Sequence, residues 1–252
     1  MKKFLSLTFG VIAAVSPSLW AQQKQPQPKS QKEVDAIMAI QNAPDPASRI
    51  AAAENLVTKF ADTEFKSFAL YIATVSAQQM NDFEKMMLYG ERTLEADPKN
   101  YATMLVMANA LAVRTREHDL DKEEKLGRAE KLANQAAEIL KTAEKPNPQL
   151  TDEQWAGAKK DFEAQQHEAL GLVAMVRKKY DVAITELKMA VESSADLATS
   201  VRLGQVYNMA GKHDDAIAVL DTVMANAEAS PQIKQVAQAE KARAVQAKGA
   251  KK

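Results

Sequence analysis

The sequence has no cysteine in 252 residues, few aromatic residues (6%), and only 8 glycines and 9 prolines. The lack of cysteine excludes structural disulfides, thiolate metal sites, thiol catalysis and a bacterial lipoprotein anchor. Few glycines and prolines, with 46% hydrophobic residues, exclude a largely disordered or collagen-like chain. Alternating runs rich in Val, Ile, Thr and aromatics, which predict strands, are also lacking.

The sequence also lacks an excess of charge of either sign, with 33 basic and 33 acidic residues. Lys2 and Lys3 lie in a segment that we expect to be removed, which leaves 31 basic and 33 acidic residues, or a charge of −2. This balance provides no large basic face, so we expect no nucleic-acid partner.

The first 21 residues have the layout of a secretory signal peptide. Two lysines precede an apolar stretch from Phe4 to Val15, and Ala21 stands before a polar run. We therefore predict cleavage after Ala21 and an exported protein, periplasmic or secreted. The alternative is an uncleaved membrane anchor, but the apolar run is short for a span and Pro17 interrupts a helix near its end. After cleavage we expect no membrane-spanning segment. The polar stretch 22–30 predicts a disordered linker.

Beyond residue 30 the sequence predicts an all-α fold. Alanine, leucine, lysine, glutamate and glutamine dominate, and each proline falls between apolar-periodic segments. Capping residues precede several segments: Asp45 and Ser230 stand before proline, and Asn81, Asp121 and Thr151 each precede a Glu or Gln at capping-box spacing. The expected helices are 31–42, 46–60, 64–79, 82–96, 100–115, 121–144, 151–178, 180–194, 197–210, 213–228 and 231–247.

A repeat of 33 residues is visible when Leu170-Gly171 is placed over Leu203-Gly204. Tyr180 then aligns with His213, Ala183 with Ala216, and Leu187 with Leu220. Small residues at Gly204 and Ala216 let two helices of a hairpin cross closely, and Gly211 provides the turn between them.

These residues resemble the tetratricopeptide repeat, whose first helix carries Leu-Gly and an aromatic and whose second carries Ala, a large apolar residue and Ala. The segment KFADTEF is similar to one seen in exported bacterial relatives. The resemblance implies a right-handed α-solenoid of stacked helix–turn–helix repeats over 31–249. The best repeats are 164–196 and 197–230, and the divergent ones are 31–63, 67–99 and 100–146.

No pattern of catalytic or metal-binding residues stands out. HEALG at 167–171 begins like a zinc-protease helix, but Gly171 occupies the place of the second histidine. The sequence contains no GxSxG, P-loop or GxGxxG motif. We therefore expect no enzyme, no catalytic residue, no metal and no cofactor.

The resemblance instead implies protein binding, because stacked repeats form a concave surface lined by the first helix of each repeat. Carried over to this sequence, the groove positions include apolar residues such as Phe68 and Leu172, which are equally interpreted as packing residues. The predicted partner-binding residues are Tyr71, Gln78, Asn109, Gln205 and Asn208.

The function predicted on this basis is an exported scaffold or adaptor that holds a protein or peptide partner in the cell envelope. Two alternatives stay open: a ligand-binding or enzymatic domain with its site in an insertion at 115–150, and a self-associating structural protein. The sequence does not identify the partner or the oligomeric state.

Overall fold

The computed structural model describes residues 26–250. The predicted signal peptide and residues 22–25 of the predicted linker lie outside this range. Residues 26–30 are exposed coil, and the ammonium group of Lys29 lies 2.6 Å from a carboxylate oxygen of Asp62. The main-chain N–H of Lys29 donates to the buried Glu33 carboxylate at 2.6 Å. The chain entering the first helix is thus held against the connection between the second and third helices.

The described residues form eleven helices and no strand, so the all-α prediction and the eleven expected helices are confirmed. None of these helices is long and apolar enough to cross a bilayer. Their bounds are α1 (Gln31–Gln41), α2 (Pro46–Lys59), α3 (Lys66–Gln79), α4 (Phe83–Ala96), α5 (Tyr101–Arg114), α6 (Lys122–Thr142), α7 (Asp152–Val176), α8 (Tyr180–Ser193), α9 (Leu197–Met209), α10 (His213–Ala225) and α11 (Pro231–Gly249).

Three of the predicted helix caps are present, and two are not. Asp45 and Ser230 accept the expected main-chain hydrogen bonds, and Thr151 forms a full capping box. Asp121 makes no side-chain cap bond. The prediction for Asn81 was also wrong, because α4 is capped by Asp82, whose carboxylate accepts from the Lys85 N–H at 3.0 Å.

Three hairpin turns share one backbone conformation. Asn81, Lys178 and Gly211 have φ of 56°, 61° and 73°, the left-handed region that ends helices. In each turn the following N–H returns to a carbonyl five residues back at 2.9 Å. Gly211 was expected at such a turn, and the other two residues adopt the same conformation with a side chain attached.

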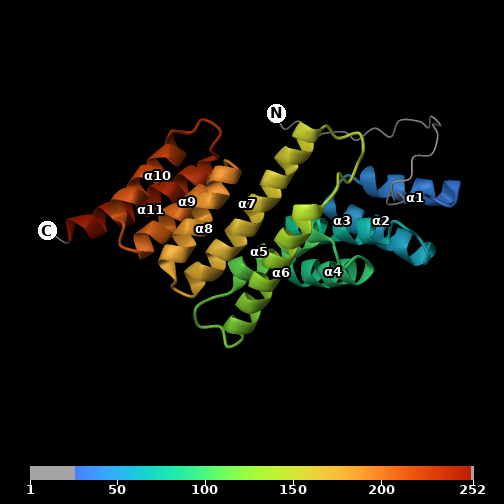
Figure 1. The fold of residues 1–252 in the computed structure, drawn as a ribbon, viewed down its shortest axis with the longest axis horizontal. Coiled ribbons are helices and arrows are strands. Elements are labelled where there is room, and N and C mark those ends of the chain that lie inside the picture. Colours follow the sequence, from blue (N-terminus) through green and yellow to red (C-terminus); the bar gives the residue numbers. More distant parts are fainter. Residues whose placement is uncertain (1–25, 251–252) are drawn as a thin grey trace.

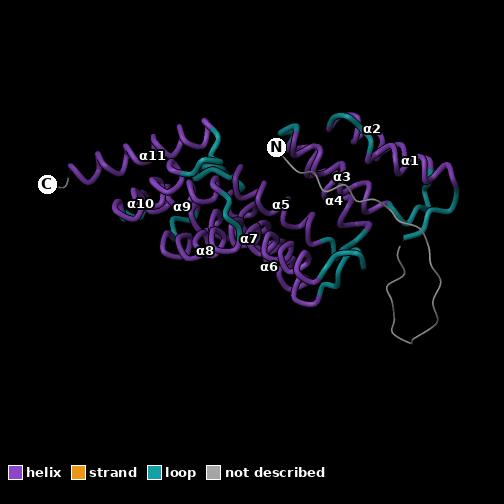
Figure 2. The backbone as a smooth tube through the Cα atoms, turned by 90° about the horizontal axis from the view of Figure 1, so that it is seen from above, coloured by secondary structure: helices purple, strands orange, loops and turns teal. Residues whose placement is uncertain are grey.

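The helices pack as successive antiparallel hairpins: α1 with α2, α3 with α4, α5 with α6, α7 with α8, and α9 with α10, followed by α11. Each second helix also packs on the first helix of the next hairpin. The result is an elongated stack with α1 and α11 at opposite ends (Figure 1). In Figure 2 the chain is arched, with α5 on the inner side and α6 and α8 on the outer side.

The hairpins cross where the sequence predicted small residues. A Cβ placed on Gly204 would lie 2.7 Å from Leu220 Cγ, and one on Gly171 would lie 2.7 Å from Leu187 Cγ. In the α3–α4 hairpin Gly90 replaces the leucine, and Met107 of α5 fills the space, 2.6 Å from an added Cβ. The divergent repeat therefore keeps its volume filled with a residue from its neighbour.

Buried side chains form apolar clusters that follow one another along the stack. One cluster joins α1 to α4, the next joins α5, α6 and α7, and two more continue from α7 to α11. Because each hairpin buries its apolar face only against its neighbours, the core is continuous along the array rather than central.

Candidate functional site

A pocket of about 300 Å³ opens on the side formed by the first helices of the hairpins. Its wall combines residues from α3, α4, α5, α7 and α9 with the turn between α3 and α4. Two of the five predicted partner-binding residues lie in it. The lining residues are Gln78, Asn81, Asp82, Phe83, Met86, Asn109, Ala110, Val113, Arg114, Glu168 and Arg202.

One rim of the pocket is fixed by the α3–α4 turn. The left-handed conformation of Asn81 directs its carbonyl and side-chain oxygens toward Arg114, whose Nη2 donates to them at 3.2 and 2.8 Å. The same guanidinium group lies 4.9 Å from the centre of the Phe83 ring, within the range of a cation–π contact. Arg114 is therefore committed to the rim.

The floor of the pocket contains Asn109, whose amide nitrogen is fully used. Nδ2 donates to the carbonyl of Leu105 in the same helix at 3.0 Å, and to the carbonyl of Gln165 in α7 at 2.9 Å. This pair of bonds fixes the orientation of the amide. Its Oδ1 is buried and has no hydrogen-bond partner among the described residues.

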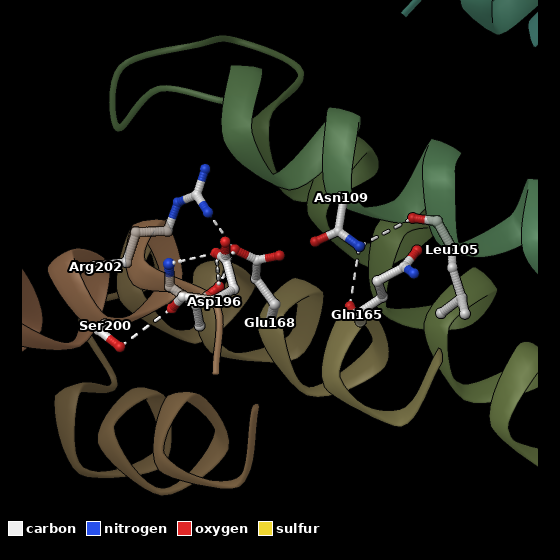
Figure 3. A network of polar contacts seen from close by, with 8 residues as sticks. Leu105, Asn109, Gln165, Glu168, Asp196, Ser200 and Arg202 are labelled. Atoms are coloured by element: carbon white, nitrogen blue, oxygen red, sulfur yellow. Dashed lines mark hydrogen bonds and ion pairs between the residues drawn. The ribbon is translucent and has the colours of Figure 1, made fainter. Parts of the chain in front are cut away.

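The opposite wall is a charged network between α7 and α9 (Figure 3). Glu168 Oε1 forms an ion pair with Arg202 and lies 2.9 Å from the Thr199 hydroxyl. That hydroxyl also lies 2.8 Å from a carboxylate oxygen of Asp196, the residue that caps α9. The two side chains of the ion pair are 17% and 31% exposed, so this contact is shielded more than a surface pair.

The other three predicted residues lie outside the pocket. Asn208 donates to the Glu240 carbonyl of α11 at 2.9 Å, and Gln205 lies 3.4 Å from the Glu240 carboxylate. The last helix therefore covers these two amides. Tyr71 is half-buried in α3, and this burial raises the pKa of its hydroxyl above the usual value.

Residues of the pocket that sequence reasoning missed include Asp82, Phe83, Arg114 and Arg202. Arg202 could have been found from the sequence, because Glu168 and Arg202 are opposite charges on first helices one repeat apart. Leu172 was considered as either a groove residue or a packing residue. It is 3% exposed, so it is a packing residue.

The segment 115–150 contains a loop, the long helix α6 and a second loop. α6 contributes Leu126, Leu132 and Leu140 to the buried core between α5 and α7, so most of the supposed insertion is the second helix of a hairpin. The pocket includes none of its residues.

The histidines are spread over the described chain. His167 Nδ1 lies 2.7 Å from a Glu186 carboxylate oxygen and so joins α7 to α8, whereas His118 is exposed and His213 begins α10. No group of three or more His, Cys, Asp or Glu residues suited to a metal ion occurs in residues 26–250.

This arrangement defines a solenoid built from repeated helical hairpins, with a polar pocket on the side of their first helices. The solved structures give the solenoid its class: the chain has the tetratricopeptide-repeat fold, as its residues predicted. It is similar to a thermophilic tetratricopeptide-repeat protein of Thermus thermophilus, with a TM-score of 0.57 and 16% identity over 83% of this chain and 95% of that one.

A tetratricopeptide-repeat protein from Parabacteroides merdae is also similar, with a TM-score of 0.44 and 15% identity over 86% of this chain and 91% of that one. No family model matches the sequence. No curated protein matches it either. The likeness is therefore one of fold.

Proposed function

We propose that the chain is an exported scaffold that binds a protein or peptide partner in the cell envelope through the side formed by its first helices, and that it catalyses no reaction. The pocket is the observation that carries this proposal. Its wall comes from four consecutive hairpins, and its lining residues include apolar side chains and Asn109, whose buried oxygen has no hydrogen-bond partner among the described residues. Such a surface suits a segment of another protein, which supplies main-chain and side-chain groups together.

Export is supported by the amino-terminal sequence, where two lysines, an apolar stretch and Ala21 are arranged as in a signal peptide. The lack of cysteine is compatible with an oxidising compartment, because no thiol is exposed to oxidation there.

The test is photo-crosslinking in the cells that make the protein. A photoreactive phenylalanine analogue at Val113, an exposed residue of the pocket wall, is expected to capture a partner from the envelope fraction. The matched control places the analogue at Lys131, an exposed residue of α6, and this helix lies on the outer side of the arch in Figure 2. The same fraction is expected to contain the chain with Gln22 as its first residue.

A partner captured from position 131 and never from 113 would place binding on the outer side and refute the pocket. An unprocessed chain that stays in the cytoplasmic fraction would refute export. Capture of a second copy of the chain itself would favour the self-associating alternative.

A further inference from the structure

The pocket offers acceptor oxygens that no donor of the described chain reaches. Asn109 Oδ1 is buried without a partner, while its own Nδ2 is held by two carbonyls. Glu168 uses Oε1 for both Arg202 and Thr199, and among the described residues no hydrogen bond reaches its Oε2. Figure 3 shows the Asn109 side-chain oxygen and the Glu168 carboxylate directed toward the same space between α5 and α7.

A buried acceptor without a donor is costly, so such a site favours a ligand that brings N–H groups. The pocket's own cations do not fill this role. Arg114 is bound to the Asn81 oxygens and lies over Phe83, and Arg202 is paired with the other oxygen of Glu168. No donor of residues 26–250 bonds either oxygen, so a ligand that brings N–H groups completes the site.

We infer that the pocket binds the guanidinium group of an arginine side chain in the partner segment. This inference rests on the proposed function, since it names the chemistry of the group that enters the same pocket. A guanidinium group carries five N–H donors in one plane, so a single group reaches acceptors on two helices at once. One of its hydrogen bonds, to Glu168, is charge-assisted.

The remaining walls fit the stem of such a side chain. Ala110 and Val113 provide apolar surface beside the acceptors, along which the three methylene groups of arginine pack. A lysine ammonium is a compact and more strongly hydrated charge, and it loses more hydration on entering a half-enclosed pocket. A guanidinium group also lies against Arg202 with less penalty, because its charge is delocalised.

The experiment uses the purified protein and heptapeptides of alanine and glutamine, acetylated and amidated, with one central test residue. The test residues are arginine, lysine, citrulline and glutamate. Citrulline has the shape of arginine without the charge. The readout is the NMR shift of the Asn109 side-chain amide and the Val113 methyl groups during titration. The arginine peptide is expected to shift both signals and to bind about tenfold more tightly than the citrulline peptide, as for a hydrogen bond to a charged group.

Two substitutions of the exposed residue Gln78 test whether the pocket prefers a positively charged group. The Gln78 side chain lines the pocket and forms no hydrogen bond within the described chain, so its replacement leaves the fold intact. Gln78→Glu is expected to strengthen binding of the arginine peptide by about two- to fivefold, and Gln78→Lys to weaken it by as much, because an added rim charge acts through solvent. The matched control, Lys131→Glu on the outer side, is expected to change nothing.

A third variant removes the charge-assisted contact. Glu168→Gln keeps an oxygen for Thr199 but loses the carboxylate charge that both Arg202 and the ligand use. Binding of the arginine peptide is expected to fall about tenfold or more. The melting temperature of each variant is recorded beside its affinity, so that a loss of fold is recognised.

The arginine assignment would be overturned if the citrulline peptide or the lysine peptide bound as tightly as the arginine peptide. It would also be overturned if no peptide shifted the Asn109 signal. The proposed scaffold function is tested independently of the arginine assignment, by the crosslinking experiment. If crosslinking from Val113 captures a partner while arginine peptides show no preference, the pocket binds a different group and the scaffold function stands.

Discussion

Asn109 and Asn208 illustrate how a residue's role depends on a neighbour that the sequence does not place. Both were predicted to face a partner, because the register of the tetratricopeptide repeat places them on the concave surface. In the structure each donates through Nδ2 to a main-chain carbonyl of the next first helix, Asn109 to α7 and Asn208 to α11. The amides therefore join consecutive hairpins, and the Asn109 oxygen, on a residue that lines the pocket, is buried without a hydrogen-bond partner among the described residues.

Replacement of Asn208 by alanine is expected to destabilise the protein, because the hydrogen bond from Nδ2 to the Glu240 carbonyl of α11 is lost. The carbonyl keeps its donor within the helix, so the cost is that of one hydrogen bond, about 0.5–1.5 kcal/mol. The measurement is the free energy of unfolding by urea. Asn134→Ala is the control, since Asn134 is exposed on α6, and it is expected to change stability by less than about 0.5 kcal/mol. Equal effects of the two changes would show that the contact to α11 contributes nothing.

At the scale of helices, the all-α fold follows from local patterns, whereas the site depends on contacts between repeats. Proline positions, caps and apolar periodicity predicted each helix with bounds close to those observed. The pocket was missed in part because it combines the start of α4 with the end of α5, a pairing set by the turn at Asn81. No local pattern encodes that approach, since it arises from how one hairpin stacks on the next.

The divergent α3–α4 hairpin shows the same limit. Gly90 departs from the large residue that the repeat pattern requires, and sequence comparison alone indicated a weak repeat. The missing volume is supplied by Met107 from the following hairpin, a compensation that becomes visible only when α4 and α5 are placed together.

The close crossing of α9 and α10 yields a prediction at this scale. Gly204→Ala places a methyl group 2.7 Å from Leu220 Cγ, so the Leu220 side chain or the two helices have to shift. Overpacking of this kind costs about 1–3 kcal/mol. Gly157→Ala is the matched change, because an added Cβ at this α7 position meets no atom within 4 Å. It is expected to stabilise the helix by up to about 1 kcal/mol.

Thermal unfolding of the two variants measures the difference directly. A lowered melting temperature for Gly204→Ala together with a raised one for Gly157→Ala supports the crossing. If both changes raise the melting temperature, helices α9 and α10 do not approach each other as closely as the structure places them.

For the whole molecule, the joints between successive first helices differ in kind. α5 packs directly on α7 and α9 on α11, and each of these joints also carries an asparagine amide bond. α7 and α9 do not pack on each other in this way, and they are linked by the contacts of Glu168 with Thr199 and Arg202.

In mechanical terms we expect the joint between α7 and α9 to be more compliant than those at α5–α7 and α9–α11, and the pocket contains the charge pair that closes this joint. Loosening the pair should therefore change the shape of the whole molecule.

The chain has no cysteine, so two introduced cysteines, at Met38 in α1 and Ala242 in α11, carry spin labels without ambiguity. Electron–electron resonance is expected to show a broader distance distribution for Glu168→Gln than for the parent protein. Asp221→Asn removes an ion pair between α10 and α11, which also pack on each other, and should leave the distribution unchanged. Equal distributions in all three proteins would mean that the joint is stiff without the ion pair. A broader distribution for Glu168→Gln alone would mean that the ion pair in the pocket wall holds the curvature of the arch.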